Sequence, residues 1–463
     1  MCSREILDKR LRNRWAGSLP TPSARKSFEP DPVSTGVGIG AYLETFDRCA
    51  FFCEVDVYSG RASQIIAGRR LAAEGESLSV AAAGSRLPET ADVVVVGAGI
   101  IGLSIAWRLA LSGQKVVVVD KGQVGSGASL AATGMLAAAA EYEAGGEILI
   151  AFALESQRRW EAFGAELEQA SGLDIDFDRS GTIVVAMTRD ETARLRGRFE
   201  LHQKVGLESR WLTGAEVRDF EGGLRPTVTA GIHCPGDFQV DPRRVMPALE
   251  IAAKRAGVII VENVDVTGLL TSAGAISGVA SGDDECQAPL VVLTTGAYAG
   301  SGQLLPADLA IPVRPLRGQS VSLRSSANQP PLLRHVIWTE QVHMAPKSGG
   351  RLIVGATVEE VGFDANVTVG GLFALLDAAR RALPSVEDVA VEAVWSGFRP
   401  TSEDDAPILG AAGLPGLLLA VGHHRNGILL APATADAIAG WALGTQVAPS
   451  AQYLNLQRFG RRL

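Results

Sequence analysis

From about residue 90 onward, the hydrophobic pattern switches between strand-like and helix-like periods. Residues 92–99, DVVVVGAG, form a β-branched run typical of a strand buried on both faces of a parallel sheet. Residues 100–113, IIGLSIAWRLALSG, have helical spacing and end at a glycine, and residues 114–122, QKVVVVDKG, form a second buried strand. A strand, a helix and a strand in this order predict a βαβ unit and a doubly wound α/β domain.

Three later segments fit the same domain. Residues 151–172 place Trp160, Phe163, Leu167 and Ala170 on one helical face, which is typical of core packing. Residues 244–266 predict a helix followed by a strand, and residues 417–444 predict a strand, a glycine-containing turn and a helix.

A different pattern lies between these segments. From about residue 312 to 398, strand-like segments show alternating apolar and polar positions around one amphipathic helix at 372–383, which ends before Pro384. Paired strands are also predicted around Ser180 and Gly181. We therefore expect an α/β fold in which a doubly wound domain is interleaved with a mixed-sheet α+β domain. The doubly wound domain comprises residues 89–165, 241–311 and 396–450, and the mixed-sheet domain comprises residues 166–240 and 312–395.

The first 88 residues lack sustained periodicity and are rich in Arg, Ser, Pro and Gly. Residues 1–26 carry seven Lys or Arg against two acids, so a basic targeting segment is one interpretation. We favour a poorly ordered extension over residues 1–88, or a start site assigned too early, with one short helix at 62–75.

Composition narrows the class of protein. The 463 residues are 47% hydrophobic and 20% charged, as in an ordinary globular enzyme, and the net charge of −8 disfavours nucleic acid as a partner. The apolar span 93–111 contains three glycines and Arg108, which favours a strand and a helix over a membrane span.

The five scattered cysteines, Cys2, Cys49, Cys53, Cys234 and Cys286, form no disulfide framework and favour a reducing, cytoplasmic compartment. We also expect a homo-oligomer.

A GxGxxG motif lies at the predicted strand-to-helix turn. Gly97 permits a tight turn, Gly99 lets backbone approach a pyrophosphate, and Gly102 allows close packing of the helix on the strand. Asp120 ends the next strand, where a carboxylate binds a ribose 2′-hydroxyl and disfavours NADP. Residues 125–141 are mostly small and would let backbone follow an extended cofactor. These patterns predict a dinucleotide site and leave NAD and FAD open.

Four stretches, in order, resemble the glycine oxidases of the D-amino-acid oxidase family. They are GAGIIGLSIA at 97–106, GSGASLAATGM at 125–135, LIVGATVEEVGFD at 352–364, and the pair SGFRPTSEDDAPILG at 396–410 with GHHRNGILLAP at 422–432. The resemblance covers about residues 89–445. It implies FAD as the cofactor, held without a covalent bond, because relatives with covalent flavin use a cysteine in the C-terminal region and none follows Cys286 here.

The resemblance also assigns the cofactor contacts. It implies that backbone N–H groups of the 423–429 turn face the flavin ring and that Val266 touches the adenine. The complete implied set is Gly97, Gly99, Ile100, Ile101, Gly102, Asp120, Lys121, Ala128, Ser129, Thr133, Gly134, Met135, Val266, His423, His424, Arg425, Asn426, Gly427, Ile428 and Leu429. No metal site is expected, because no Cys, Asp or Glu cluster accompanies the two histidines.

Three residues are implied at the substrate. Arg399 matches the arginine that anchors the substrate carboxylate, a role that suits a buried guanidinium. Arg425 is expected to point towards the substrate. His343 stands where relatives often carry a tyrosine, and Gln341 and Val358 are expected to face the same pocket.

The resemblance implies FAD-dependent oxidation of glycine by O2, which gives an imine that hydrolyses to glyoxylate and ammonia, together with hydrogen peroxide. The imine would alternatively supply the thiazole ring of thiamine, with the thiazole synthase machinery as a partner. Two alternatives remain open: a sarcosine or D-amino-acid oxidase or dehydrogenase, and a flavin-binding subunit without a substrate. The presence of both Arg399 and Arg425 argues against the second.

Overall fold

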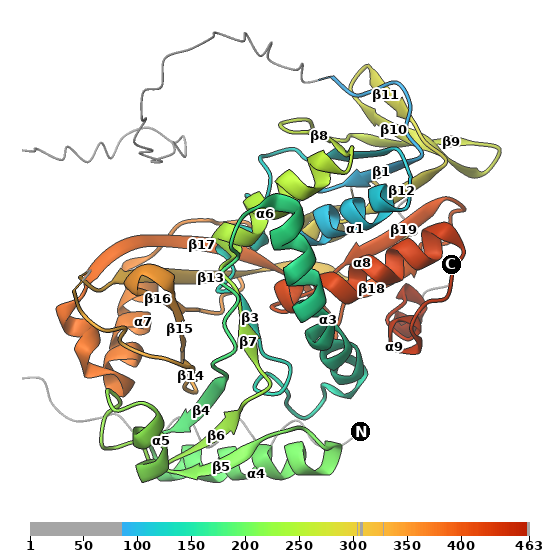
Figure 1. The fold of residues 1–463 in the computed structure, drawn as a ribbon. Helices are drawn as coiled ribbons and strands as arrows, with labels where there is room; N and C mark the ends of the chain where they lie inside the picture. Colours follow the sequence, from blue (N-terminus) through green and yellow to red (C-terminus); the bar gives the residue numbers. More distant parts are fainter. Residues whose placement is uncertain (1–85, 303, 306–308, 327, 461–463) are drawn as a thin grey trace, which may run out of the picture. The chain divides into compact units, whose positions relative to one another are not determined.

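The computed structural model describes residues 86–460, except residues 303, 306–308 and 327 (Figure 1). These residues belong to one unit of the chain, residues 79–463. The extension expected over residues 1–88 lies outside the described residues, apart from its last three, and so does the helix expected at 62–75.

A six-stranded sheet carries the predicted βαβ unit. Its strands, in order across the sheet, are β18 (Ile408–Ala411), β19 (Leu417–Val421), β12 (Leu290–Leu293), β1 (Val93–Val96), β2 (Val116–Val119) and β8 (Ile259–Val261). All neighbours are parallel except β18 and β19. The winding direction reverses at β1, which pairs with β2 on one side and β12 on the other. In open parallel sheets a ligand crevice forms at such a point.

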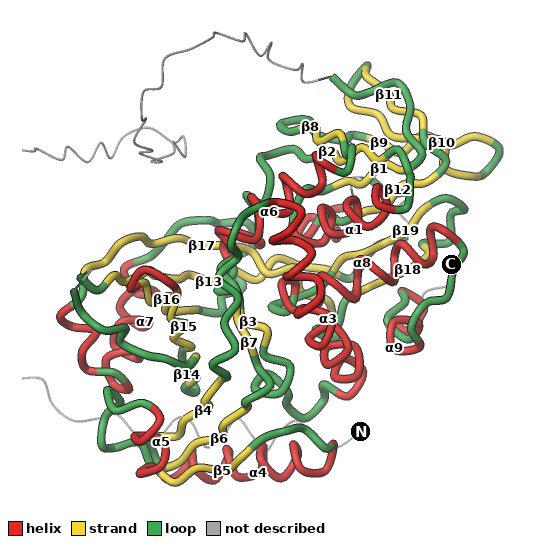
Figure 2. Tube along the Cα trace, in the orientation of Figure 1, coloured by secondary structure: helices red, strands yellow, loops and turns green. Residues whose placement is uncertain are grey.

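The two faces of this sheet are covered differently (Figure 2). In β1, Val93 and Val95 pack towards the helices, and Val94 and Val96 pack towards a small antiparallel sheet. The helices are α1 (Ile100–Leu111), α3 (Glu147–Ser171), α6 (Pro242–Arg255) and α8 (Gly427–Leu443), and the small sheet is β11 (Asp284–Gln287), β10 (Ala275–Ser281) and β9 (Gly268–Ser272). The continuous valine runs are explained, because side chains on both faces are buried.

A second, eight-stranded mixed sheet forms the other part of the unit. Its order is β17 (Ala390–Ser402), β13 (Val313–Arg324), β16 (Arg351–Gly355), β15 (His343–Lys347), β14 (Val336–Trp338), β4 (Thr182–Ala186), β6 (Ala230–Cys234) and β5 (Arg210–Thr213). Only β14 and β4 pair in parallel. Helices α5 (Gly214–Phe220) and α7 (Val369–Ala382) pack on one face, and α4 (Arg189–Val205) packs on the other.

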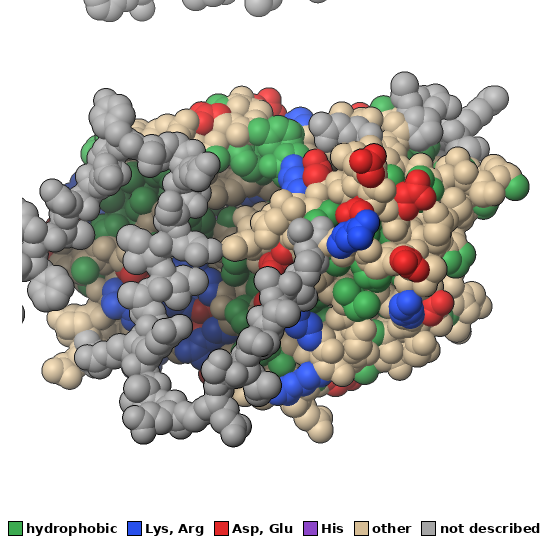
Figure 3. All heavy atoms as spheres, turned by 90° about the horizontal axis from the view of Figure 1, so that it is seen from above, with side chains coloured by type: hydrophobic (Ala, Val, Ile, Leu, Met, Phe, Trp, Pro, Cys, Tyr) green, Lys and Arg blue, Asp and Glu red, His purple; other side chains and the backbone are tan. Residues whose placement is uncertain are grey.

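The remaining short elements are α2 (Ala128–Ala131), the strand pair β3 (Met135–Leu136) and β7 (Phe238–Gln239), α9 (Pro449–Gln452), and the 3-10 helices η1 (Gly296–Ser301), η2 (Ser348–Gly350), η3 (Pro384–Asp388) and η4 (Leu456–Phe459). None of the described helices combines the length and apolarity needed to cross a bilayer. On the face drawn in Figure 3, acidic side chains are interspersed with basic ones over the described residues.

The predicted helices at 100–113, 151–172 and 372–383 are observed within a few residues of their expected bounds. The predicted strand pair around Ser180 and Gly181 is wrong, since only β4 follows it. Asp176 has a φ of 57°, a left-handed conformation that a strand cannot accommodate, and the preceding segment makes one isolated bridge, Asp178 with Gln239. The expected domain boundary at residue 396 falls inside β17.

Candidate active site

One cavity of about 920 Å³ lies where the two large sheets meet, at the carboxyl ends of β1 and β2. The segments that follow β2 and β8 of the six-stranded sheet contribute Asp120 and Val266, and the eight-stranded sheet contributes the residues around His343 and Arg399. A single space therefore connects the predicted nucleotide site with the predicted substrate site.

The turn after β1 requires glycine at two positions. Gly97 has a φ of +116°, and a Cβ on it would lie 2.5 Å from the backbone oxygen of Thr294. A Cβ on Gly102 would lie 1.9 Å from the backbone oxygen of Gly97, so the first turn of α1 packs directly on the strand end. Gly99 lines the cavity, and a Cβ there would meet only Ser129 Oγ, at 3.2 Å. This is a close-approach surface for an extended ligand.

The N-terminus of α1 opens into the cavity. No side chain caps it through Gly99, and its first turn contains no acid. The Ile100 N–H donates to Ser129 Oγ at 2.9 Å, which fixes α2 beside the turn, and Ile101 lines the wall next to it. Because no acid lies in its first turn, this helix end supplies positive potential suited to a pyrophosphate.

Asp120 is held rigidly at the end of β2. Its Oδ2 accepts the Ala98 N–H at 2.7 Å, and its Oδ1 accepts the Gly122 N–H at 2.7 Å. A carboxylate has further lone pairs for two ribose hydroxyls. Beside it, the Lys121 ammonium lies over the Tyr298 ring, 3.1 Å from the centroid. Val266 is buried and lines the same end of the cavity.

Residues 128–135 form the next part of the wall. Ala128, Ser129, Thr133, Gly134 and Met135 all line the cavity. At Gly134, φ is +84° and a Cβ would lie 2.0 Å from the Val240 backbone oxygen. The small side chains at these positions keep the backbone itself at the cavity surface.

The 422–429 turn leads into α8, whose first turn has no capping side chain and no acid. His423, His424, Arg425, Gly427 and Ile428 line the cavity.

Two expected members of this turn do not line the cavity. Asn426, which directly precedes α8, is buried and is absent from the cavity wall. Leu429 is 1% exposed in the core, and its carbonyl accepts hydrogen bonds from Ser156 and Trp160.

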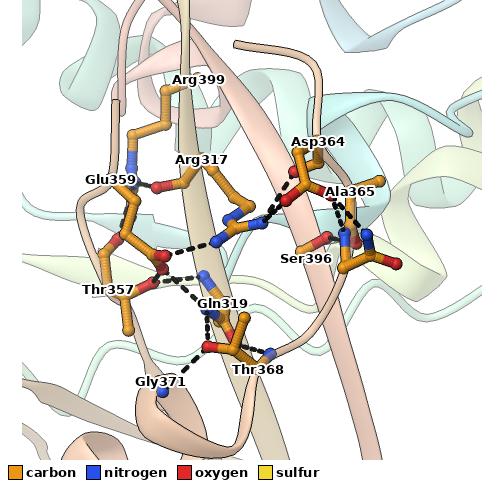
Figure 4. Close-up of polar contacts among 11 residues, drawn as sticks. Arg317, Gln319, Thr357, Glu359, Asp364, Ala365, Thr368, Gly371, Ser396 and Arg399 are labelled. Carbon is orange, nitrogen blue, oxygen red and sulfur yellow. Dashed lines mark hydrogen bonds and ion pairs between the residues drawn. The ribbon is translucent and has the colours of Figure 1, made fainter. Parts of the chain in front are cut away.

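Arg399 projects from β17 at the substrate end (Figure 4). Its Nη1 donates to the Thr357 carbonyl at 3.0 Å and to the Arg317 carbonyl at 3.4 Å. Burial, and then the charge of Arg425, lowers its pKa. Within the described part of the chain it has no ion pair with a carboxylate. A guanidinium desolvated in this way favours binding of an anion.

Arg425 differs from Arg399, because its guanidinium is already paired with a carboxylate. Its Nε lies 2.8 Å from Glu141 Oε2. Burial raises the pKa of Glu141, and the charge of Arg425 partly offsets that rise. The sequence analysis did not identify Glu141, which is the last residue of the small-residue stretch at 125–141. Its position there was the only available signal, since 284 residues separate it from Arg425.

His343 lies in the cavity wall on β15, beside the Trp338 ring. Burial, and then the charges of Arg399, Arg425 and Lys347, lowers its pKa to about 3, so the imidazole is neutral at pH 7. Its Nε2 is buried without a hydrogen-bond partner among the described residues. Gln341 and Val358 line the cavity as well.

The two adjacent histidines have protein partners. His423 Nε2 lies 3.1 Å from Thr434 Oγ1, and His424 Nδ1 lies 2.9 Å from Thr401 Oγ1. Within residues 86–460, gaps aside, no group of three or more His, Cys, Asp or Glu side chains has the arrangement of a metal site.

These features fit FAD. The glycine turn, the uncapped start of α1 and the fixed Asp120 suit a ribose and a pyrophosphate, and the small-residue wall and the start of α8 suit a flat ring system. The two described cysteines, Cys234 and Cys286, are buried free thiols and do not line the cavity.

Comparison with known proteins agrees with an FAD site. Residues 92–441 match the model of the FAD dependent oxidoreductase (DAO) family. The chain is 37% identical over 374 residues to the "Bifunctional protein ThiO/ThiG" of Synechocystis sp., a match that covers 80% of this chain and 54% of that protein. It is 36% identical over 348 residues to "Glycine oxidase" of Geobacillus kaustophilus, covering 74% and 90%. The chain thus spans about half the length of the bifunctional relatives it matches.

The fold is also similar to solved structures. The crystal structure of glycine oxidase from Geobacillus kaustophilus matches with a TM-score of 0.75 and 32% identity, covering 81% of this chain and 99% of that chain.

Proposed function

The chain belongs to the FAD dependent oxidoreductase (DAO) family, and from this membership we propose that it oxidises glycine with O2. The products would be the imine, or glyoxylate and ammonia after hydrolysis, and hydrogen peroxide. The names of two relatives, glycine oxidase and ThiO/ThiG, support this substrate. Sarcosine and small D-amino acids remain alternative substrates of the same chemistry.

One observation carries the proposal. Arg399 presents a partly buried guanidinium without a carboxylate partner among the described residues, in the cavity that also holds the nucleotide-binding features. The other cavity-lining arginines each have an acid: Arg314 pairs with Glu360, and Arg425 pairs with Glu141. Among the described arginines that line the cavity, Arg399 is therefore the one without an acid partner, which suits a small monocarboxylate such as glycine.

The cofactor would be held by the glycine turn, by Asp120 and by residues 128–135. When bound, FAD supplies the acceptor for the hydride that leaves the substrate Cα and passes the electrons on to O2. The uncapped start of α8 would stabilise negative charge developing nearby.

The chain's own side chains position the substrate. Arg399 would hold the carboxylate in a bidentate pair and so fix the direction of the amine and the Cα–H bond. His343, which is neutral at pH 7 and lines the cavity, would exchange a hydrogen bond with the carboxylate or the amine. The Trp338 ring would form an apolar wall that excludes water beside it.

We further propose that the imine feeds formation of the thiazole ring of thiamine. The support is the bifunctional ThiO/ThiG relatives, which match this chain over about half their length. The buried free thiols of Cys234 and Cys286 support a reducing compartment such as the cytoplasm. Assembly into a homo-oligomer stays a proposal.

Anaerobic mixing of the purified flavoprotein with glycine tests the function directly. Loss of the flavin absorbance, followed by its recovery and by peroxide when air is admitted, is the expected result. An unchanged flavin spectrum at high glycine concentration would contradict glycine as the substrate. Bleaching without peroxide on reoxidation would instead indicate a dehydrogenase that uses another electron acceptor.

A further inference from the structure

A partly buried polar network lies beside Arg399 (Figure 4). Its centre is Arg317 on β13, which is 3% exposed. Arg317 Nη2 donates to Glu359 Oε2 at 2.5 Å, and Nη1 donates to Asp364 Oδ2 at 2.9 Å and to the Asp364 carbonyl at 3.0 Å. One guanidinium therefore holds two acids from a single segment, residues 356–368, which contains neither helix nor strand.

The same segment is tied to β13 at the backbone. The Arg317 N–H donates to the Glu359 carbonyl at 2.9 Å, and the Glu359 N–H donates back to the Arg317 carbonyl at 3.0 Å. The side chain of Gln319, fully buried, donates to Glu359 Oε1 at 2.7 Å and to Thr368 Oγ1 at 3.0 Å. The segment is thus anchored near its middle and at its end.

Thr357 connects this network to the cavity. Its Oγ1 donates to Glu359 Oε1 at 2.5 Å and accepts the Gln319 N–H at 2.9 Å. Its carbonyl accepts Arg399 Nη1 at 3.0 Å. The Arg399 guanidinium is consequently oriented by two carbonyl oxygens that the network places, that of Thr357 at 3.0 Å and that of Arg317 at 3.4 Å. Ala356, Val358 and Ala365 of the same segment line the cavity, so the network also fixes that wall.

We infer that Arg317 is a positioning residue for carboxylate recognition, which acts on Arg399 through Glu359 and Thr357. The inference rests on the proposed role of Arg399 as the carboxylate anchor. Arg317 itself does not line the cavity. Because its guanidinium is planar and reaches two acids at once, lysine can replace its charge but not both contacts.

The test uses the full-length flavoprotein with Arg317→Lys and Glu359→Gln, and with Arg324→Gln as the matched control. Arg324 lies on the same strand and pairs with Glu392, away from the cavity. The measurements are kcat and KM for glycine and for ethylamine, which lacks a carboxylate, the Kd of acetate from flavin absorbance, and flavin content.

For Arg317→Lys and Glu359→Gln we expect the KM for glycine and the Kd of acetate to rise about tenfold. The kcat for glycine and both constants for ethylamine should stay within about twofold of wild type, and Arg324→Gln should change none of them. In an Arg399→Ala background, Glu359→Gln should add nothing, because the residue through which it acts is gone.

The positioning role would be overturned if kcat/KM fell equally for glycine and for ethylamine. It would also be overturned if the effects of Glu359→Gln and Arg399→Ala were additive in the double variant. If Arg317→Lys fails to fold, Glu359→Gln, which removes the charge but keeps the shape, decides the question. If wild type does not oxidise glycine, the proposed function fails, while the acetate titration still tests whether Arg317 orients Arg399.

Discussion

The guanidinium of Arg399 lies against the backbone of Gly318 on the neighbouring strand, so closely that a Cβ on the glycine would come within 2.5 Å of Nη1. Leu316 and Gly318 flank Arg317 on β13, and Arg399 is paired in register with Leu316. The absence of a side chain at position 318 therefore leaves room for the anchor to lie flat across the strand. The atom that a new Cβ would meet is the end of a flexible side chain, which can move at small cost to the fold.

We expect Gly318→Ala to fold normally and to displace the guanidinium of Arg399. The kcat/KM for glycine should fall by roughly 10- to 100-fold, because a misplaced anchor loses binding and orientation together. Gly268→Ala is the matched control, since a Cβ at that strand position meets nothing within 4 Å. Steady-state kinetics and a thermal melt measure the effect. A large fall in Tm with unchanged kinetics in the surviving protein would contradict the expectation.

Arg399→Ala should lower kcat/KM for glycine by about 100-fold or more, since a buried carboxylate would lose its charge-assisted partner. Ethylamine oxidation should change far less, because that amine never uses the guanidinium. Arg314→Ala serves as the control, since Arg314 lines the same cavity but already pairs with Glu360. Equal losses on glycine and ethylamine would mean that Arg399 supports the fold or the cofactor instead of recognising a carboxylate.

We expect the flavin to be released when the yellow protein is precipitated with acid. The sequence contains no cysteine after Cys286, and neither Cys234 nor Cys286 lines the cavity. The absorbance of the supernatant and of the washed pellet is the measurement. Yellow colour that stays with the pellet would show a covalent bond and contradict the expected mode of attachment.

Stability should depend on pH through buried histidine. Burial lowers the pKa of His423 to about 3, whereas an unfolded histidine titrates near about pH 6.5. Between about pH 6.5 and pH 3, His423 is protonated in the unfolded chain but stays neutral in the folded chain. The free energy of unfolding therefore falls as the pH is lowered through this range. His423→Gln should therefore reduce the loss of unfolding free energy between about pH 7 and pH 5 by up to about 2 kcal/mol.

Urea unfolding at several pH values measures this slope. Thr434→Val removes the hydroxyl beside His423 Nε2 but keeps the imidazole, so it should lower stability without changing the pH dependence. A slope that is the same in wild type and His423→Gln would contradict the assignment.

Local backbone requirements explain why much of the nucleotide end could be predicted. Gly97 has the positive φ of a tight turn and Gly102 meets the carbonyl of Gly97, both within the motif, and Asp120 follows directly from the end of a valine strand. The Trp160, Phe163 and Leu167 stripe likewise is buried as its spacing indicates.

The parts that could not be predicted depend on contacts between distant segments. Glu141 meets Arg425, and Arg317 meets Asp364, only after the two sheets have formed. The sheet formed by β9, β10 and β11 was missed for another reason. No residue of β9 is fully buried, so the apolar alternation is weak there.

The pairing of β13 with β17 has a mechanical consequence. The two strands stay in register from Val313 with Ser402 to Arg324 with Ala390, interrupted by one irregularity next to Leu323. Val313 packs in the core under the six-stranded sheet, whereas Val321 packs under the eight-stranded sheet. The paired strands therefore connect the two halves of the site rigidly, and Arg399 lies on one of them. A hinge between the halves would have to break that ladder, so substrate entry and product exit should depend on movement of side chains and short loops at the cavity mouth.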